Sequence, residues 1–400
     1  MALDMTTASA ILKTLYPAVR VKSITYKNNP LLAMLPKDEN FTGKNLEVPL
    51  QYGNPQGRSA NFANAQTNAG NSAYKSFLIT RIKDYGVATI DNETIEAAKD
   101  NKGAFLRTLE TEMNNMLFSI RRSLATALYR NGSGSIGQLS ATSGVTTLIT
   151  LSEKRDHTNF EVGMVLELST ADGGGSVKSG TTKITAINRG AGQLTVATSL
   201  ATFSAAGAQN DFIFMQGDYD AKVSGLAAWI PSSAPGATPF FSVDRTLDTE
   251  RLGGVRIAGN GLPIEEILID TMEQMGSYGA SPDKFFMNFR EWGSLAKTLE
   301  GKVQIINIEV DGVVGFRGMR MQGPTGSVDI IPDVNCPAGL GYLLQLDTWS
   351  LKSLGPTPHI FDTDGLTSLR QATADGVEVR GQYYAQLCCN APGWNAVVSF

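Results

Sequence analysis

A glycine-rich stretch is the first feature of this sequence that could support chemistry. Residues 132–137 read GSGSIG and match the G-x-G-x-x-G pattern of dinucleotide-binding turns. That turn needs a strand before it and a helix after it, so that the helix N-terminus meets the pyrophosphate. Here a helical pattern precedes and a β pattern follows, which favours a flexible joint instead. Residues 173–179 (GGGSVKS) lack the Gly directly before the Lys of a phosphate-binding loop, and we expect a hairpin tip there.

The side chains that could act as nucleophiles or metal ligands form no recognisable constellation. His157 and His359 are far apart and belong to no H-E-x-x-H or C-x-x-C pattern, so a zinc site is not expected. We expect His157 in a surface loop and His359 packed near Pro358. The sequence also lacks the G-x-S-x-G motif of a hydrolase nucleophile. We therefore predict no catalytic residues, no cofactor-binding residues, no metal site and no cofactor; an enzyme remains a remote alternative.

The three cysteines, Cys336, Cys388 and Cys389, do not suggest a disulfide framework, because the count is odd and two are adjacent. A reducing compartment is the better interpretation. Cys388 and Cys389 lie in the strand-like run 383–390, where a buried free thiol is the default.

Composition places the chain among folded, soluble proteins. With 400 residues, 42% hydrophobic and 18% charged, it can bury a large core and is predicted to form two or three domains. No apolar run approaches the roughly 20 residues that span a bilayer, and MALDMTTASA does not resemble a signal peptide. The net charge of −4, without a Lys/Arg block, argues against a reader of nucleic acid held by phosphate contacts. The charge does not exclude a protein that forms the wall of a compartment and merely faces nucleic acid.

Residues 1–43 are predicted to form an arm, because three X-Pro pairs interrupt them. A short apolar patch within this arm needs a surface on which to lie. The residues expected to make this N-arm contact are Leu31, Leu32, Met34 and Leu35.

Residues 44–90 are predicted to form an extended β-loop whose tip is 54–73 (NPQGRSANFANAQTNAGNSA). The flanks 46–52 and 74–90 have strand-like sequences, and Arg58 is the only charged residue of the tip. Structureless connections of this length are usually functional or disordered. An amide-rich, nearly uncharged tip favours hydrogen bonding along a neighbouring surface over disorder. The residues expected to make this contact are Asn54, Arg58, Asn61, Phe62, Asn64, Gln66, Asn68 and Asn71.

The rest of the chain predicts an α+β fold. Within 91–137, apolar residues recur at three- and four-residue steps over 103–130, which indicates a helix roughly 40 Å long. Residues 218–400 predict two helices, one after Pro263 and one carrying Trp292, around the short strand 284–287; β structure follows.

Residues 138–217 are rich in Thr and Gly and lack Pro, Trp and Tyr, and their short β runs predict a small barrel or sandwich inserted as a domain. A β extension continuous with the host sheet is the alternative. We expect the ends of the insertion to lie close together. Its predicted core residues are Val165, Leu166, Leu168, Ile184, Ile187, Leu194, Val196, Phe212 and Phe214.

The order of these parts resembles the Hong Kong 97-type major capsid proteins of tailed bacteriophages. Local stretches add to the resemblance: NNPLLAMLP is similar to their arm, SPDKFFMNFREWGSLAKTL to a strand-helix step of their axial domain, and GSVDIIPDVNCPAGLGYLLQLDTWSL to their return toward the peripheral domain. The resemblance covers about 1–135 and 222–400. The insertion is not part of the minimal family fold.

The resemblance implies a Hong Kong 97-like fold with an N-terminal arm, an extended loop, a spine helix, and peripheral and axial domains. It implies a structural protein that assembles in the host cytoplasm into hexamers and pentamers of the icosahedral shell of a virion, which encloses double-stranded DNA. Residues 44–90 would lie across an adjacent subunit. Implied partners are other copies of the chain, a portal, non-specifically contacted DNA and, since no long helical N-terminal extension is seen, a separate scaffolding protein; a decoration protein is left open.

One departure from the family concerns covalent bonds between subunits. Some members join a Lys of the loop to an Asn next door, but 54–73 contains no Lys; Lys44 and Lys75 lie at the base. We therefore predict a shell held by non-covalent contacts. Two further alternatives remain: an encapsulin-like nanocompartment, and a carbohydrate-binding module in 138–217, against which the lack of Trp and Tyr for sugar stacking counts.

Overall fold

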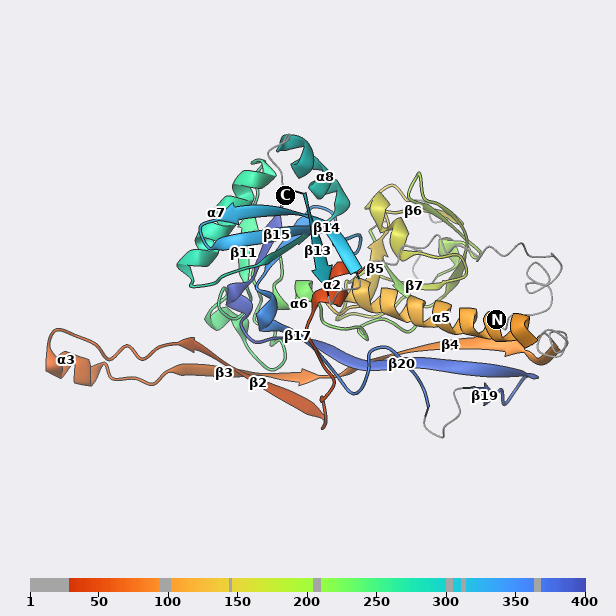
Figure 1. Cartoon of the computed structure of the whole chain (residues 1–400), viewed down its shortest axis with the longest axis horizontal. Helices are drawn as coiled ribbons and strands as arrows, with labels where there is room; N and C mark the ends of the chain where they lie inside the picture. Colours follow the sequence, from red (N-terminus) through yellow and green to blue (C-terminus); the bar gives the residue numbers. More distant parts are fainter. Residues whose placement is uncertain are drawn as a thin grey trace.

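The chain forms a body from which a long arm projects, as the computed structural model shows (Figure 1). The structure describes residues 29–93, 102–143, 146–203, 210–299, 305–310, 314–362 and 368–400, and it describes the side chains of all of these except 102–111 and 305–317. Residues 1–28, which hold most of the predicted N-terminal arm, lie outside the described residues. Helices and strands both build the described part, in agreement with the expected α+β class.

The long strand β20 (Gly376–Cys389) organises the sheet at the base of the body. Strand β4 (Ile82–Asp91) pairs antiparallel with it over its whole length. The predicted extended loop of 44–90 therefore differs from the structure at its C-terminal end, because β20 satisfies the backbone groups of β4 within the same chain. The other strands of this sheet are β17 (Trp349–Ser353), β18 (His359–Ile360) and β19 (Leu369–Arg370), which pair with β20, and β1 (Lys37–Asp38), which pairs with β17.

The predicted spine helix is α5 (Lys102–Ala127), which lies along β4 and β20 (Figure 1). Met116, Ile120, Leu124 and Leu128 of its predicted stripe are buried. Helix and sheet approach closely because Gly86 and Gly381 stand opposite each other on the two strands. A Cβ added at Gly86 would lie 2.8 Å from Cδ1 of Ile120, and one at Gly381 would lie 2.8 Å from Cε of Met116. The two glycines make room for the helix.

A seven-stranded mixed sheet forms the axial part of the body. Its strands, in spatial order, are β11 (Val255–Ala258), β21 (Ala396–Ser399), β16 (Leu340–Leu344), β12 (Lys284–Met287), β15 (Gly326–Pro332), β14 (Val314–Gly323) and β13 (Ile305–Val310). Helices α7 (Ile264–Ser277) and α8 (Phe289–Thr298) cover one face. Because side chains alternate along a strand, Phe285 and Met287 pack under these helices while Phe286 faces the central core.

The insertion is a small closed barrel. Its strands, in spatial order, are β5 (Ser135–Gln138), β10 (Phe212–Met215), β7 (Val165–Ser169), β8 (Thr182–Asn188), β9 (Gln193–Val196) and β6 (Leu148–Thr150). An antiparallel bridge between Leu139 and Leu151, next to β5 and β6, closes the sheet on itself. Closure leaves no free edge, and the barrel has a hydrophobic core of its own. The structure therefore contradicts the alternative, in which the insertion would be a β extension of the host sheet.

The predicted core of this barrel is right in part. Leu166, Leu168, Ile184, Leu194 and Val196 are buried in it, and Ile187 packs against it. On β10 the alternation is opposite to the prediction: Ile213 faces the core, whereas Phe212 is half-buried and Phe214 packs on Tyr219, with 4.9 Å between ring centroids. Both sides of β10 are apolar, so the sequence could not tell which side faces inward.

The glycine-rich stretch 132–137 is a tightly packed crossing, not the flexible joint that we expected. Gly132 and Gly134 have φ values of +92° and +87°. A Cβ on Gly134 would lie 2.1 Å from the carbonyl oxygen of Asp218, where the chain leaves the barrel. The amide of Asp220 donates to the carbonyl of Ser133 at 2.7 Å. The two ends of the insertion are therefore adjacent.

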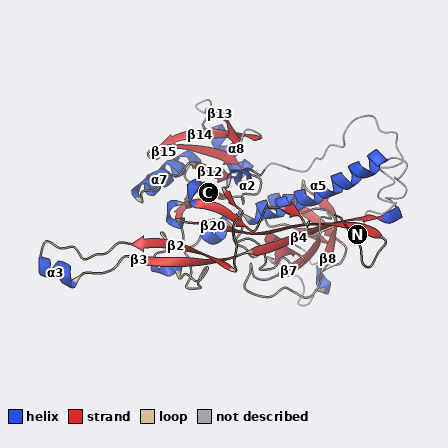
Figure 2. Ribbon diagram, turned by 60° about the horizontal axis from the view of Figure 1, so that its bottom comes forward, coloured by secondary structure: helices blue, strands red, loops and turns tan. Residues whose placement is uncertain are grey.

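The arm is a hairpin of β2 (Asn45–Gly53) and β3 (Ala73–Thr80), paired from Asn45 opposite Thr80 to Gly53 opposite Ala73. Its far end carries the short helix α3 (Phe62–Thr67). Figures 1 and 2 show in two views that the arm extends away from the body. The remaining short helices are α2 (Pro30–Met34), α6 (Leu226–Trp229), η2 (Lys154–Asn159), η3 (Leu200–Thr202), η4 (Arg245–Leu247), η5 (Leu346–Thr348) and η6 (Pro392–Trp394).

Candidate assembly surfaces

The root of the arm is fixed to the body by aromatic packing. Phe77 of β3 is fully buried, and its ring centroid lies 5.1 Å from that of Trp229 and 6.4 Å from that of Phe240, both edge-on. Arg251 donates from Nη1 to the carbonyl of Tyr52 at 2.6 Å. Aromatic pairs in this geometry stabilise beyond the area they bury, by about 0.5–1.5 kcal/mol each. The direction in which the arm leaves the body is thus set by the chain itself.

The tip of the arm is exposed. Each of the eight tip residues predicted to contact a neighbour is exposed: Asn54, Arg58, Asn61, Phe62, Asn64, Gln66, Asn68 and Asn71. Phe62 is 81% exposed, although it begins helix α3. Aromatic residues are enriched at protein interfaces, so this exposed ring at the end of a projecting arm is a candidate contact residue.

Local hydrogen bonds order the tip. The Asn61 side chain accepts from the amide of Ala63 at 2.9 Å and so caps α3. Gly57 lies so close to Ala69 that a Cβ on it would be 2.8 Å from the Ala69 Cα, which brings the two sides of the tip together. The tip has a defined shape, and the hydrogen bonds of its described side chains stay within the arm.

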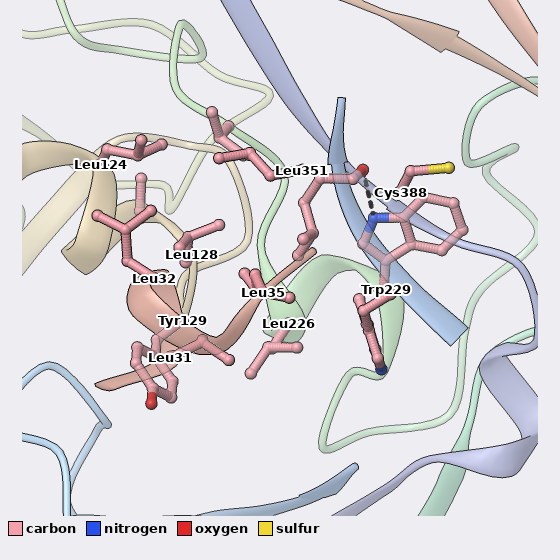
Figure 3. Close-up of a cluster of buried hydrophobic side chains, with 14 of the residues drawn as sticks. Leu31, Leu32, Leu35, Leu124, Leu128, Tyr129, Leu226, Trp229, Leu351 and Cys388 are labelled. Carbon is pink, nitrogen blue, oxygen red and sulfur yellow. Dashed lines mark hydrogen bonds between the residues drawn. The ribbon is translucent and has the colours of Figure 1, made fainter. Parts of the chain in front are cut away.

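The apolar patch of the N-terminal arm finds its surface within the chain itself. Leu31, Leu32 and Leu35 are buried in the central core, and Met34 packs against it. Figure 3 shows these leucines beside Leu124, Leu128 and Tyr129 of the spine region and beside Leu226 and Trp229. The patch therefore belongs to the core of its own subunit. It leaves little area for a contact between subunits.

A buried carboxylate holds this N-terminal segment in place. Asp333 accepts from the Tyr129 hydroxyl at 3.0 Å, from the Leu31 amide at 3.5 Å and from the Asn335 amide at 2.9 Å. Burial raises the pKa of Asp333, and the hydrogen bonds oppose that shift. Local sequence patterns do not reveal this site, because Leu31, Tyr129 and Asp333 are about 100 to 300 positions apart.

A second polar site lies where the barrel joins the spine. The Lys222 ammonium is 2.6 Å from Oδ2 of Asp84 on β4 and 3.1 Å from Oδ2 of Asp218, and it donates to Ser123 of α5 at 3.0 Å. Burial, partly opposed by Lys222, raises the pKa of Asp218 to about 6. Lys222 is only 8% exposed, so this cluster ties barrel, helix and sheet together.

A groove of about 520 Å³ runs beside this cluster, between α5 and β4. Its lining residues are Asp84 to Thr89 of β4; Glu112, Met116, Ser119, Ile120 and Ser123 of α5; and Met215 and Lys222 from the barrel side. No described strand other than β20 pairs with β4. The groove therefore combines apolar walls with carboxylates and a strand edge.

Ion pairs fix the barrel along the spine helix. Arg122 and Glu161 are 2.7 Å apart, and Arg130 and Asp156 are 3.0 Å apart. Burial raises the pKa of Asp156, and Arg130 opposes that shift. The barrel thus has a core of its own and is also docked on its host through half-buried ion pairs.

The His, Cys, Asp and Glu side chains of the described residues do not gather into a metal site. They contain no group of three or more His, Cys, Asp and Glu side chains placed to hold a metal ion. His157 is half-buried and its Nδ1 lies 2.7 Å from the carbonyl oxygen of Lys154, while His359 lies on β18. Cys336, Cys388 and Cys389 are free and buried. Among the described helices, none has the length and apolar character to cross a membrane.

Comparisons with known proteins give matches in structure alone. No protein-family model matches the sequence, and no curated protein matches it. The chain is similar to a chain of the cyanophage A-1(L) capsid asymmetric unit, with a TM-score of 0.55 and 11% identity over 98% of this chain and 97% of that one. It is also similar to a capsid chain of a native GTA particle, with a TM-score of 0.51 and 9% identity over 100% and 99% of the two chains.

A third similar chain comes from the holo-SrpI encapsulin complex of Synechococcus elongatus PCC 7942. Its TM-score is 0.49, with 10% identity over 100% of this chain and 96% of that chain. At these identities the likeness concerns the fold.

Proposed function

We propose that this chain, which has the Hong Kong 97-like capsid fold shared with the cyanophage A-1(L) capsid chain, is the major capsid protein of a tailed bacteriophage. In this role it is a structural protein and not an enzyme. Copies assemble in the host cytoplasm into hexamers and pentamers, and these close into the icosahedral shell of a virion around double-stranded DNA.

The observation that carries this proposal is the arm. A two-stranded ribbon is at best marginally stable alone in water, yet this one extends beyond the body and ends in an exposed, capped helix with Phe62 at its start. The root of the arm is packed on the body, whereas its tip is exposed. Such an arm gains stability when the tip lies on another subunit. Many weak contacts repeated around a closed shell add through avidity.

The partners follow from this role. A separate scaffolding protein would guide shell closure, a portal would occupy one vertex, and the inner wall would contact DNA without sequence preference. The barrel of residues 135–215 has a closed sheet and its own core, so it can protrude from the outer surface without altering the shell wall. There it could meet a neighbour or a decoration protein.

Electron microscopy of particles formed by the expressed chain, together with light scattering, tests the proposal. We expect closed shells built of hexamers and pentamers, with the barrel on the outside. A monomer or dimer as the sole native species would contradict it. Phage-derived particles that hold protein cargo and no DNA would favour the encapsulin-like alternative instead.

A further inference from the structure

The two helices that cover the axial sheet carry exposed charges of opposite sign. Helix α7 holds Glu266, Asp270 and Glu273 on its exposed side and contains no Lys or Arg. The exposed charges of α8 are Arg290 and Lys297. The single acidic residue of α8 is buried and accepts a hydrogen bond from a backbone amide. Each helix therefore presents one sign of charge to its surroundings.

These charges are not neutralised within the subunit. None of them forms an ion pair with any residue whose side chain the structure describes, although α7 and α8 pack on the same core. Arg290 also lies in the first turn of α8, where the helix dipole disfavours a cation. A carboxylate supplied by another molecule would offset both effects.

An apolar side chain lies among the acidic residues of α7. Ile269 is 44% exposed. It follows Glu266 by three positions and precedes Glu273 by four, so the three side chains share one face of the helix. An aliphatic side chain that projects from the middle of such a face is a candidate knob for a facing helix.

The exposed side of α8 has the shape of a matching hole. Arg290, Gly293, Ser294 and Lys297 are spaced i, i+3, i+4 and i+7, the four positions that surround a knob from a facing helix. A Cβ added at Gly293 would meet none of the described residues within 4 Å. Packing inside the described subunit therefore does not require this glycine, which destabilises a helix interior relative to alanine. The close approach of a second molecule would require it.

We propose that α7 of one copy packs against α8 of a second copy, with Ile269 over Gly293 and with the carboxylates of α7 opposite the cations of α8. The outer carboxylates of α7 and the cations of α8 are each seven positions apart, so both pairs span about 10 Å. The contact rests on the proposed function, and it adds a surface in the axial part through which copies meet. Figure 1 shows both helices on the outside of that part.

Cysteine pairs in assembled full-length particles test the contact. We expect particles of the double variant Ile269→Cys with Gly293→Cys to give disulfide-linked multimers on mild oxidation, since a disulfide needs Cα atoms within about 7 Å. The matched control is Ile269→Cys with Val162→Cys, because Val162 is also exposed but belongs to the inserted barrel segment. The three native thiols are buried and do not compete.

A steric variant supplies a second test that adds no cysteine. The space around Gly293 is open within the described subunit, so we expect Gly293→Leu to keep the circular dichroism of the parent. We expect it to lower the yield of particles about tenfold, an interface hot-spot effect, because the larger side chain fills the hole. The control is Gly236→Leu, at a loop glycine whose added Cβ would also meet none of the described residues within 4 Å. Its yield is expected to match the parent.

A charge exchange tests the electrostatic part of the contact. We expect Arg290→Glu with Lys297→Glu to lower the yield of particles about tenfold, and Glu266→Lys with Glu273→Lys to do the same. The chain that carries all four substitutions is expected to recover most of that yield, because the exchanged charges still attract. Losses that simply multiply in the fourfold variant would show that the two helices do not meet.

The remaining outcomes separate the helix contact from the proposed function. Particles of the cysteine pair that give no multimers, or as many as the control, would overturn the contact while leaving the proposed function intact. A parent-like yield for Gly293→Leu would do the same. If the parent chain forms no particles at all, the proposed function fails and the contact fails with it.

Discussion

The joint between the spine helix α5 and the barrel depends on charged residues that are shielded from water. Lys222 binds carboxylates from β4 and from the exit of the barrel, and Ser123 of the spine helix accepts from it. Charges taken out of water are stable only when each has its partners. The loss of one partner therefore costs far more here than at the surface.

We expect Lys222→Met to lower the free energy of unfolding by about 3 kcal/mol, because it leaves the carboxylates of Asp84 and Asp218 buried without their cation. The control is Arg380→Met, which breaks an exposed pair with Glu378 and is expected to cost less than about 1 kcal/mol. Urea unfolding of the unassembled subunit measures both. Equal losses would show that the Lys222 cluster is no more than a surface pair.

Asp218 makes the stability of the subunit depend on pH. Its pKa is about 6 in the folded chain against 3.8 as the usual value, so the folded state binds the proton more tightly than the unfolded state. Stability contributed by this group is therefore present at low pH and is lost as pH rises from about 4 through about 6. We expect the Asp218→Asn variant not to show this loss of stability with rising pH.

The measurement is the free energy of unfolding of parent and variant between pH 4 and pH 8. As pH rises to roughly 6, the free energy of unfolding of the parent is expected to fall by about 2–3 kcal/mol relative to that of Asp218→Asn, from the linkage of pKa to stability, and the difference then stays constant. Parallel pH profiles for the two proteins would rule out a raised pKa at this carboxyl.

At the scale of elements, the arm divides into a root that belongs to the body and a tip that does not. Phe77 and its aromatic neighbours hold the root. From residue 54 to residue 72 the described residues are exposed or half-buried, and none is buried. The tip can therefore change without loss of core area.

We expect the replacement of 54–73 by a short Gly/Ser turn to leave the subunit folded and to weaken assembly, because the deleted atoms contact a neighbour and not their own core. Circular dichroism and the yield of particles, each compared with the parent chain, measure the two effects. An unfolded subunit, or particles formed at the parent yield, would place the function of the tip elsewhere.

Helices and strands could be predicted wherever the sequence of a segment determines the structure of that segment. The period of apolar residues located α5, and Pro263 located the start of α7. The structure of β4 depends instead on β20, nearly 300 positions later, and no local pattern records that pairing. The orientation of β10 was missed for a related reason, because apolar residues occupy both of its sides.

Candidate contact residues were predictable to a lesser degree. The uncharged composition of 54–73 indicated an exposed tip, and the structure exposes it. The patch around Leu31 has the same apolar character whether it packs on its own core or on a neighbour, so the sequence could not decide. The groove lined by Glu112 and Met215 comes from segments about 100 positions apart and left no signal in the sequence.

At the scale of the whole molecule, the three thiols that could join subunits are buried, and the tip 54–73 of the arm contains no Lys. Burial raises the pKa of all three thiols, that of Cys388 to about 11. A thiol rather than a thiolate is therefore present at neutral pH, which disfavours disulfide exchange. Lys75 lies on β3 opposite Leu50, only two positions from the tip segment 54–73 and not at the base of the hairpin as expected; the tip itself contains no Lys.

We therefore expect a shell held by non-covalent contacts alone. Mature particles that are boiled without reductant are expected to run as a single band near 42.8 kDa on a denaturing gel. A reduced sample is the control and is expected to look the same, because no disulfide contributes. A ladder that disappears on reduction would show that a cysteine joins subunits, and a ladder that persists would point to an amide bond from Lys44 or Lys75. The first result would mean that assembly exposes a thiol that the isolated subunit keeps buried.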